Sequence, residues 1–74
     1  MINFEKQFII KILSELLAYE IYDHYIQGEI LDDIESVYNM VHTEFVHNIY
    51  KKEIIDLGTS MAINLYEVPI PNKN

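Results

Sequence analysis

The chain of 74 residues is long enough for one domain with a small core, and half of its residues are hydrophobic. It contains no cysteine, which excludes disulfide bonds and thiolate metal sites. Twelve acidic residues and five lysines give a net charge of −7, so direct binding of nucleic acid is not expected, because phosphate backbones are bound mainly through lysine and arginine. So much apolar surface in so short a chain indicates that a partner or a second copy covers part of it.

The most apolar stretch of the chain, residues 8–26, is interrupted by charged or titratable side chains. These are Lys11, Glu15, Glu20, Asp23 and His24. A membrane span needs about 20 residues with few or no charges, so this stretch is not expected to cross a membrane. No basic segment leads into an apolar one after Met1, and the sequence therefore predicts a cytoplasmic protein.

A first helix is predicted over residues 3–27, with Asn3 as its N-cap and Gly28 as the position that ends it. Its apolar residues recur at steps of three and four, and Ser14 and Ala18 fall on the opposite, polar side. The apolar sector is wider than contact with one neighbouring helix requires. This width predicts a helix that is central in a bundle or shared between two subunits.

Further helices are predicted over residues 29–50 and 52–66. The apolar stripe shifts phase near Lys51, which indicates a break or bend there, although one bent helix over residues 29–66 also satisfies the pattern. Gly58 and Ala62 are four residues apart and predict a place where another helix approaches closely. Pro69 and Pro71 favour an extended tail over residues 68–74, after a single helical domain of residues 1–67.

The predicted fold class is all-α. The first two helices form an antiparallel hairpin, or a three-helix bundle in which the third helix covers part of their groove. Homodimerisation is expected to complete this small core. The residues assigned to the core or to the dimer contact are Phe8, Ile9, Leu13, Leu16, Leu17, Ile34, Val37, Val41 and Phe45.

Two pairs of glutamate and histidine come closest to a pattern with chemical activity. Glu20 and His24 lie one turn apart on the apolar side of the first helix, where a metal or acid–base site or a structural hydrogen bond would account for them. Glu44 and His47 have the Glu-x-x-His spacing of bundle di-metal proteins, which need two such copies. No nucleophile lies beside a base, and no phosphate-binding glycine motif is present. The chain is therefore predicted not to be an enzyme and to need no metal or other cofactor.

Acidic and tyrosine residues gather in the sequence on both sides of Gly28. Acidic groups suit a basic partner, and tyrosine is enriched at interface centres. Helix capping and solubility account for the same residues without a partner. The predicted partner-binding site at this hairpin end consists of Tyr22, Asp23, Tyr25, Glu29, Asp32 and Asp33. The alternative is the polar face of the second helix, with Glu35, Asn39 and Thr43.

The leading functional hypothesis is a small acidic module that binds a protein with a basic surface. Its role would be that of an inhibitor or regulator, such as a phage- or mobile-element-encoded antagonist of a host nucleic-acid-binding enzyme. The alternatives are a homo-oligomeric scaffold subunit and a dimeric carboxylate–histidine metal bundle. An inhibitor captures one dominant protein with salt-sensitive association, a scaffold subunit forms a discrete homo-oligomer, and a metal protein copurifies with stoichiometric metal.

Overall fold

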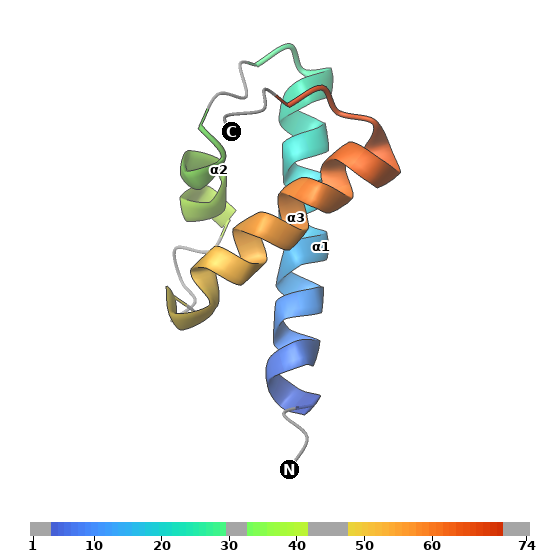
Figure 1. Ribbon diagram of the computed structural model, residues 1–74. Coiled ribbons are helices and arrows are strands. Elements are labelled where there is room, and N and C mark those ends of the chain that lie inside the picture. Colours follow the sequence, from blue (N-terminus) through green and yellow to red (C-terminus); the bar gives the residue numbers. More distant parts are fainter. Residues whose placement is uncertain (1–3, 30–32, 42–47, 71–74) are drawn as a thin grey trace.

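A computed structural model describes residues 4–29, 33–41 and 48–70, and it shows a small arrangement of helices (Figure 1). Helix α1 spans Phe4–Ile26, α2 spans Ile34–Val41 and α3 spans Lys51–Tyr66. A single 3₁₀ turn, η1, covers Asn48–Tyr50 immediately before α3. No β-strand occurs in these ranges, so the prediction of an all-α fold is confirmed. The break expected near Lys51 is also confirmed, because η1 ends and α3 begins there.

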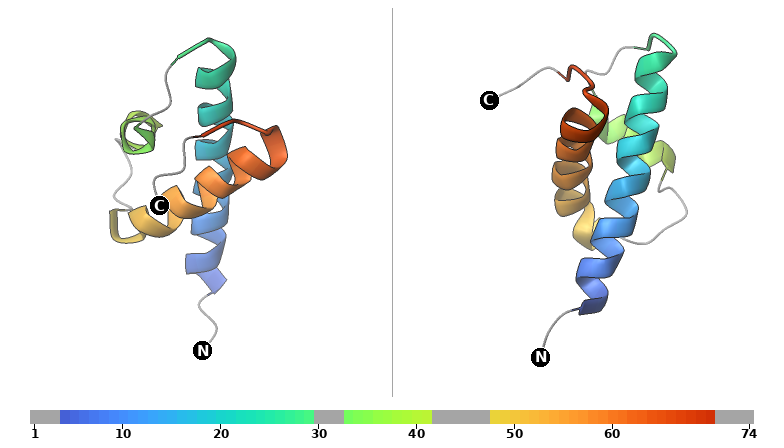
Figure 2. Two further views of the ribbon diagram at one scale, coloured as in Figure 1. Left: turned by 45° about the horizontal axis from the view of Figure 1, so that its top comes forward. Right: turned by 90° about the vertical axis from the view of Figure 1, so that its right-hand side faces the viewer.

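The largest contact between helices joins α1 to α3, which crosses it (Figures 1 and 2). Gly58 permits this approach, because a Cβ atom at that position would lie 2.8 Å from Cδ2 of Leu17. On α1, Ser14 is buried and its hydroxyl donates a long hydrogen bond of 3.5 Å to the carbonyl oxygen of Ile54. The assignment of Ser14 and Ala18 to the polar side is therefore wrong: both are buried, because α3 covers that side of α1.

Helix α2 is shorter than the helix predicted over residues 29–50. Glu29 is not helical, and it follows a turn in which Gly28 has a φ of 81°, the left-handed conformation expected there. The helix begins after Asp33, whose carboxylate accepts hydrogen bonds from the backbone N–H and the hydroxyl of Ser36. Capping by Asp33 thus sets a later start than the sequence pattern indicated. Several residues named in the predictions lie outside the described ranges: Asn3, Asp32, Thr43, Glu44, Phe45, His47 and Pro71.

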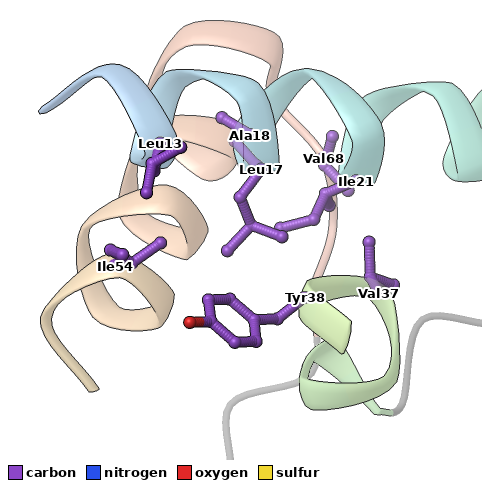
Figure 3. Close-up of a cluster of buried hydrophobic side chains, with 9 residues drawn as sticks. Leu13, Leu17, Ala18, Ile21, Val37, Tyr38, Ile54 and Val68 are labelled. Carbon is purple, nitrogen blue, oxygen red and sulfur yellow. The ribbon is translucent and has the colours of Figure 1, made fainter. Parts of the chain in front are cut away.

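The core lies where the three helices meet (Figure 3). Leu17 and Ile21 of α1 point toward Tyr38 of α2, and Ile54 of α3 lies beside them. An ion pair between Lys51 and Glu35 joins the start of α3 to α2. Helix α2 therefore covers the edge of the α1–α3 contact, whereas the sequence predicted that the first two helices would form the main pair.

The segment after α3 also contributes to the core. Glu67 adopts a left-handed conformation with φ of 56°, which reverses the chain. The N–H of Val68 then donates a 3.1 Å hydrogen bond to the carbonyl oxygen of Ala62. Val68 was assigned to an extended tail, but its side chain is buried against the core, so the packed unit extends past residue 67.

Of the nine residues predicted to form the core or a dimer contact, all but Phe45 lie in the described ranges, and these eight fall into three groups. Leu13, Leu17 and Val37 are buried, and Ile9, Ile34 and Val41 are half-buried and pack against the core. Phe8 and Leu16 are exposed, because they lie on the side of α1 that the other helices do not cover. These two do not belong to the core of the single chain, and their role in a dimer contact stays a prediction.

Burial raises the pKa of the Tyr38 phenol above its ordinary value, and the nearby Lys51 ammonium partly offsets this rise. The unfolded chain loses this proton near pH 10, whereas the folded chain holds it to a higher pH. The stability from the neutral phenol is therefore complete below about pH 10 and is lost as the pH rises through the folded pKa. In urea titrations at about pH 8 to 11, Tyr38→Phe should lose less stability than the wild type.

Tyr25→Phe is the matched control, because Tyr25 is exposed and its replacement should leave the alkaline decline unchanged. If the wild type and Tyr38→Phe lost equal stability as the pH rises, the alkaline loss of stability would be due to other groups.

Candidate functional site

The predicted site at the hairpin end is occupied largely by contacts within the chain. The ring of Tyr22 stacks on that of Tyr66 at the end of α3, with centroids 4.9 Å apart and planes inclined by 25°. The carboxylate of Asp23 accepts a 2.8 Å hydrogen bond from the side-chain amide of Gln27. Both residues therefore have structural roles, and Tyr22 is half-buried by its own fold rather than presented freely.

His24 and Glu29 form a second contact at the same end. Nδ1 of His24 lies 2.7 Å from Oε1 of Glu29, and the backbone N–H of Glu29 donates to the carbonyl oxygen of His24. The sequence instead predicts that His24 pairs with Glu20. Asp33 caps α2, and Tyr25 is exposed. These contacts explain most of the cluster through turn and helix formation, and a partner at this end stays a prediction.

A line of large apolar side chains runs along the opposite side of α1 from the core. This outer face consists of Phe8, Ile12, Leu16 and Tyr19, which follow one another at steps of four, four and three residues. All four are exposed, with Phe8 at 58% and Leu16 at 47%. Because α3 and α2 cover the other side, the wide apolar sector seen in the sequence is divided into a buried half and an open half.

A shallow hollow of about 150 Å³ lies at the N-terminal half of this face. Phe8 and Ile12 form its outer wall, and Ile9 and Leu13 form the wall toward the core. Each wall is a pair of side chains four residues apart, so the hollow is the groove between two neighbouring ridges of one helix. Helices pack together by inserting a ridge of one into such a groove of the other. The hollow therefore has the form of a helix-packing surface.

Acidic side chains surround the outer face. Each lies three or four residues from one of its members, which places it beside that member on the helix. The four are Glu5, Glu15, Glu20 and Asp23. Lys11 is the one basic residue of α1 at such a spacing, and its Nζ lies 3.1 Å from the Glu15 carboxylate. The apolar line is thus framed by net negative charge.

Phe8 and Leu16 are among the residues that the sequence predicts in the core or a dimer contact, whereas Ile12 and Tyr19 belong to no predicted site. The spacing of these four residues was sufficient to predict that they share one face of the helix. The position of α3 decides which face of α1 stays open. The contact between α1 and α3 joins distant parts of the chain.

Other kinds of site receive little support from the part of the chain that the structure covers. Within it, no three histidine, aspartate or glutamate side chains gather closely enough to hold a metal ion. Glu44 and His47 lie outside it, so the expectation of no essential metal stays a prediction. None of the helices seen there is both long and apolar enough to pass through a bilayer. Comparisons with protein-family models, curated proteins and solved structures gave no match.

Proposed function

We propose that this chain is a small acidic protein-binding module and that its partner docks on the outer face of α1. The observation that carries the proposal is the unbroken exposed line of Phe8, Ile12, Leu16 and Tyr19 beside a helix-packing groove. Contiguous apolar surface of this kind on a small protein marks a contact site, whereas single exposed apolar residues are ordinary.

The chemistry of the face favours a protein over other ligands. Its acidic frame repels phosphate groups and anionic lipid surfaces. Its groove is open and lined by aliphatic and aromatic side chains, as protein interfaces are at their centres. A regulator or inhibitor of a larger protein, including an antagonist of a nucleic-acid-binding enzyme, needs only a surface of this type. The scaffold alternative uses the same face, with a second copy as the partner.

Affinity capture from the native cell tests this proposal with three baits: the wild type, Leu16→Asn and Leu65→Asn. Leu65 lies on α3, is 65% exposed and provides the same chemical change at a residue that is not a member of the outer face. The wild type and Leu65→Asn should retain one dominant protein, and Leu16→Asn should reduce its yield about tenfold, because a polar amide would be buried in the contact. Circular dichroism should show that all three baits are equally helical.

Two outcomes would count against the proposal. Equal capture by the wild type and by Leu16→Asn would mean that the partner binds elsewhere, with the hairpin end as the next candidate. A wild type that captures nothing and sediments as a discrete homo-oligomer would establish the scaffold alternative.

A further inference from the structure

We infer that the outer face of α1 receives a single amphipathic helix of another protein, with lysine or arginine on both flanks of that helix's apolar stripe. This inference rests on the proposed function and adds the chemical class of the partner. Two independent features carry it: the shape of the groove and the distribution of charge around it.

The shape of the surface specifies a helix. The ridge of Phe8, Ile12 and Leu16 runs beside the ridge of Ile9 and Leu13, and the hollow lies between them. A ridge of side chains four residues apart on a second helix fits such a groove when the two axes cross at about 50°. The outer face from Phe8 to Tyr19 is about 16 Å long at the helical rise per residue, or roughly three turns of α1. One helix that crosses at this angle contacts the part of the face around the crossing point.

The charges specify the flanks of that helix. Glu15 and Glu20 lie on either side of the apolar line, while Glu5 and Asp23 lie near its two ends, as their spacing along α1 requires. A partner with basic residues on both flanks would place them beside these carboxylates. Such exposed pairs act mainly by speeding association and by rejecting partners of the wrong sign.

The same charges argue against a second copy of this chain as the occupant. Each copy carries a net charge of −7 and would bring an identical acidic frame to the contact. Like charges across an interface oppose association. Lys11 offers little relief, because it is one lysine beside the four carboxylates that border this face. The homodimer predicted from the sequence therefore suits this face less well than a basic helix does.

Two synthetic peptides of about five helical turns test the inference. Both have leucine along one stripe; one has lysine on the two flanks and the other has glutamate. Fluorescence anisotropy, at peptide concentrations below self-association, should show that the lysine peptide binds the wild type at least about tenfold more tightly. Its affinity should fall as salt is raised. Ile12→Asn and Leu16→Asn should each weaken it about tenfold or more, whereas Leu65→Asn should not.

These variants leave the net charge unchanged, so they separate docking in the groove from general attraction between a basic peptide and an acidic protein. Equal binding of the lysine peptide to the wild type and to Leu16→Asn would overturn the inference, as would equal binding of the two peptides. A wild type that sediments as a dimer, and becomes a monomer in Leu16→Asn, would assign the face to a second copy. If a captured partner needs Leu16 but the lysine peptide does not bind, the proposed function stands and this inference fails.

Discussion

Replacing Leu17 with alanine should lower the free energy of unfolding by about 2–5 kcal/mol. The Leu17 side chain is fully buried between α3 and α2, so its removal loses apolar burial and leaves a cavity (Figure 3). Small domains have a total stability of only about 5–15 kcal/mol, so this single change removes a large part of it. Urea unfolding followed by circular dichroism measures the loss.

Leu16→Ala is the matched control, one residue away on the same helix and 47% exposed. It should change stability by about 0.5 kcal/mol or less in the monomer. If Leu16→Ala lowered the free energy of unfolding as much as Leu17→Ala does, and if this effect of Leu16→Ala became smaller on dilution of the protein, self-association would be shown to bury the outer face.

Replacing Gly58 with valine should destabilise the fold by about 3 kcal/mol, because the new side chain would occupy the space of Leu17. A Cβ atom alone would come within 2.8–3.1 Å of three side-chain atoms of Leu17. Leu17 is fully buried and cannot swing into solvent, so α1 and α3 would have to separate. Even Gly58→Ala should destabilise, although alanine favours a helix over glycine by about 1 kcal/mol.

Ser60→Val supplies the control, since it places the same β-branched residue at an exposed position of α3. In the double variant Leu17→Ala/Gly58→Val, the valine would enter space that the leucine has vacated. The double variant should therefore lose less stability than the sum of the losses in the two single variants. Strict additivity, or a Gly58→Val variant as stable as Ser60→Val, would mean that the two helices do not meet closely at this point.

Local signals in the sequence predicted several features of this fold correctly, although not the extent of the second helix. The phase shift near Lys51 coincides with η1 and the start of α3, and Gly28 adopts the left-handed turn after α1. The close approach expected at Gly58 and Ala62 is also present, because both are buried in the contact with α1. Each of these features depends on the preferences of a few neighbouring residues.

The pairing of the helices could not be predicted in the same way. Helix α1 is apolar over so much of its surface that its periodicity does not select one neighbour. The phase of the helix predicts Ser14, like Ala18, on the polar side, but the small size of Ser14 is what matters where α3 approaches. Tyr22 was similarly assigned to a partner site, and its stacking partner Tyr66 lies at the far end of the chain. Contacts between distant residues decided both cases, and they also decided which side of α1 stayed open.

Because the main contact joins the first helix to the last, the order of synthesis has a consequence for folding. Leu17 and Ile21 emerge from the ribosome long before Ile54 and Val68, which complete their surroundings. Throughout that interval both apolar sides of α1 are uncovered, the future core as well as the outer face. Nascent chains with such exposed surface are prone to aggregate and are typical clients of chaperones. The core around Leu17 can therefore close only after the chain has been made as far as Val68.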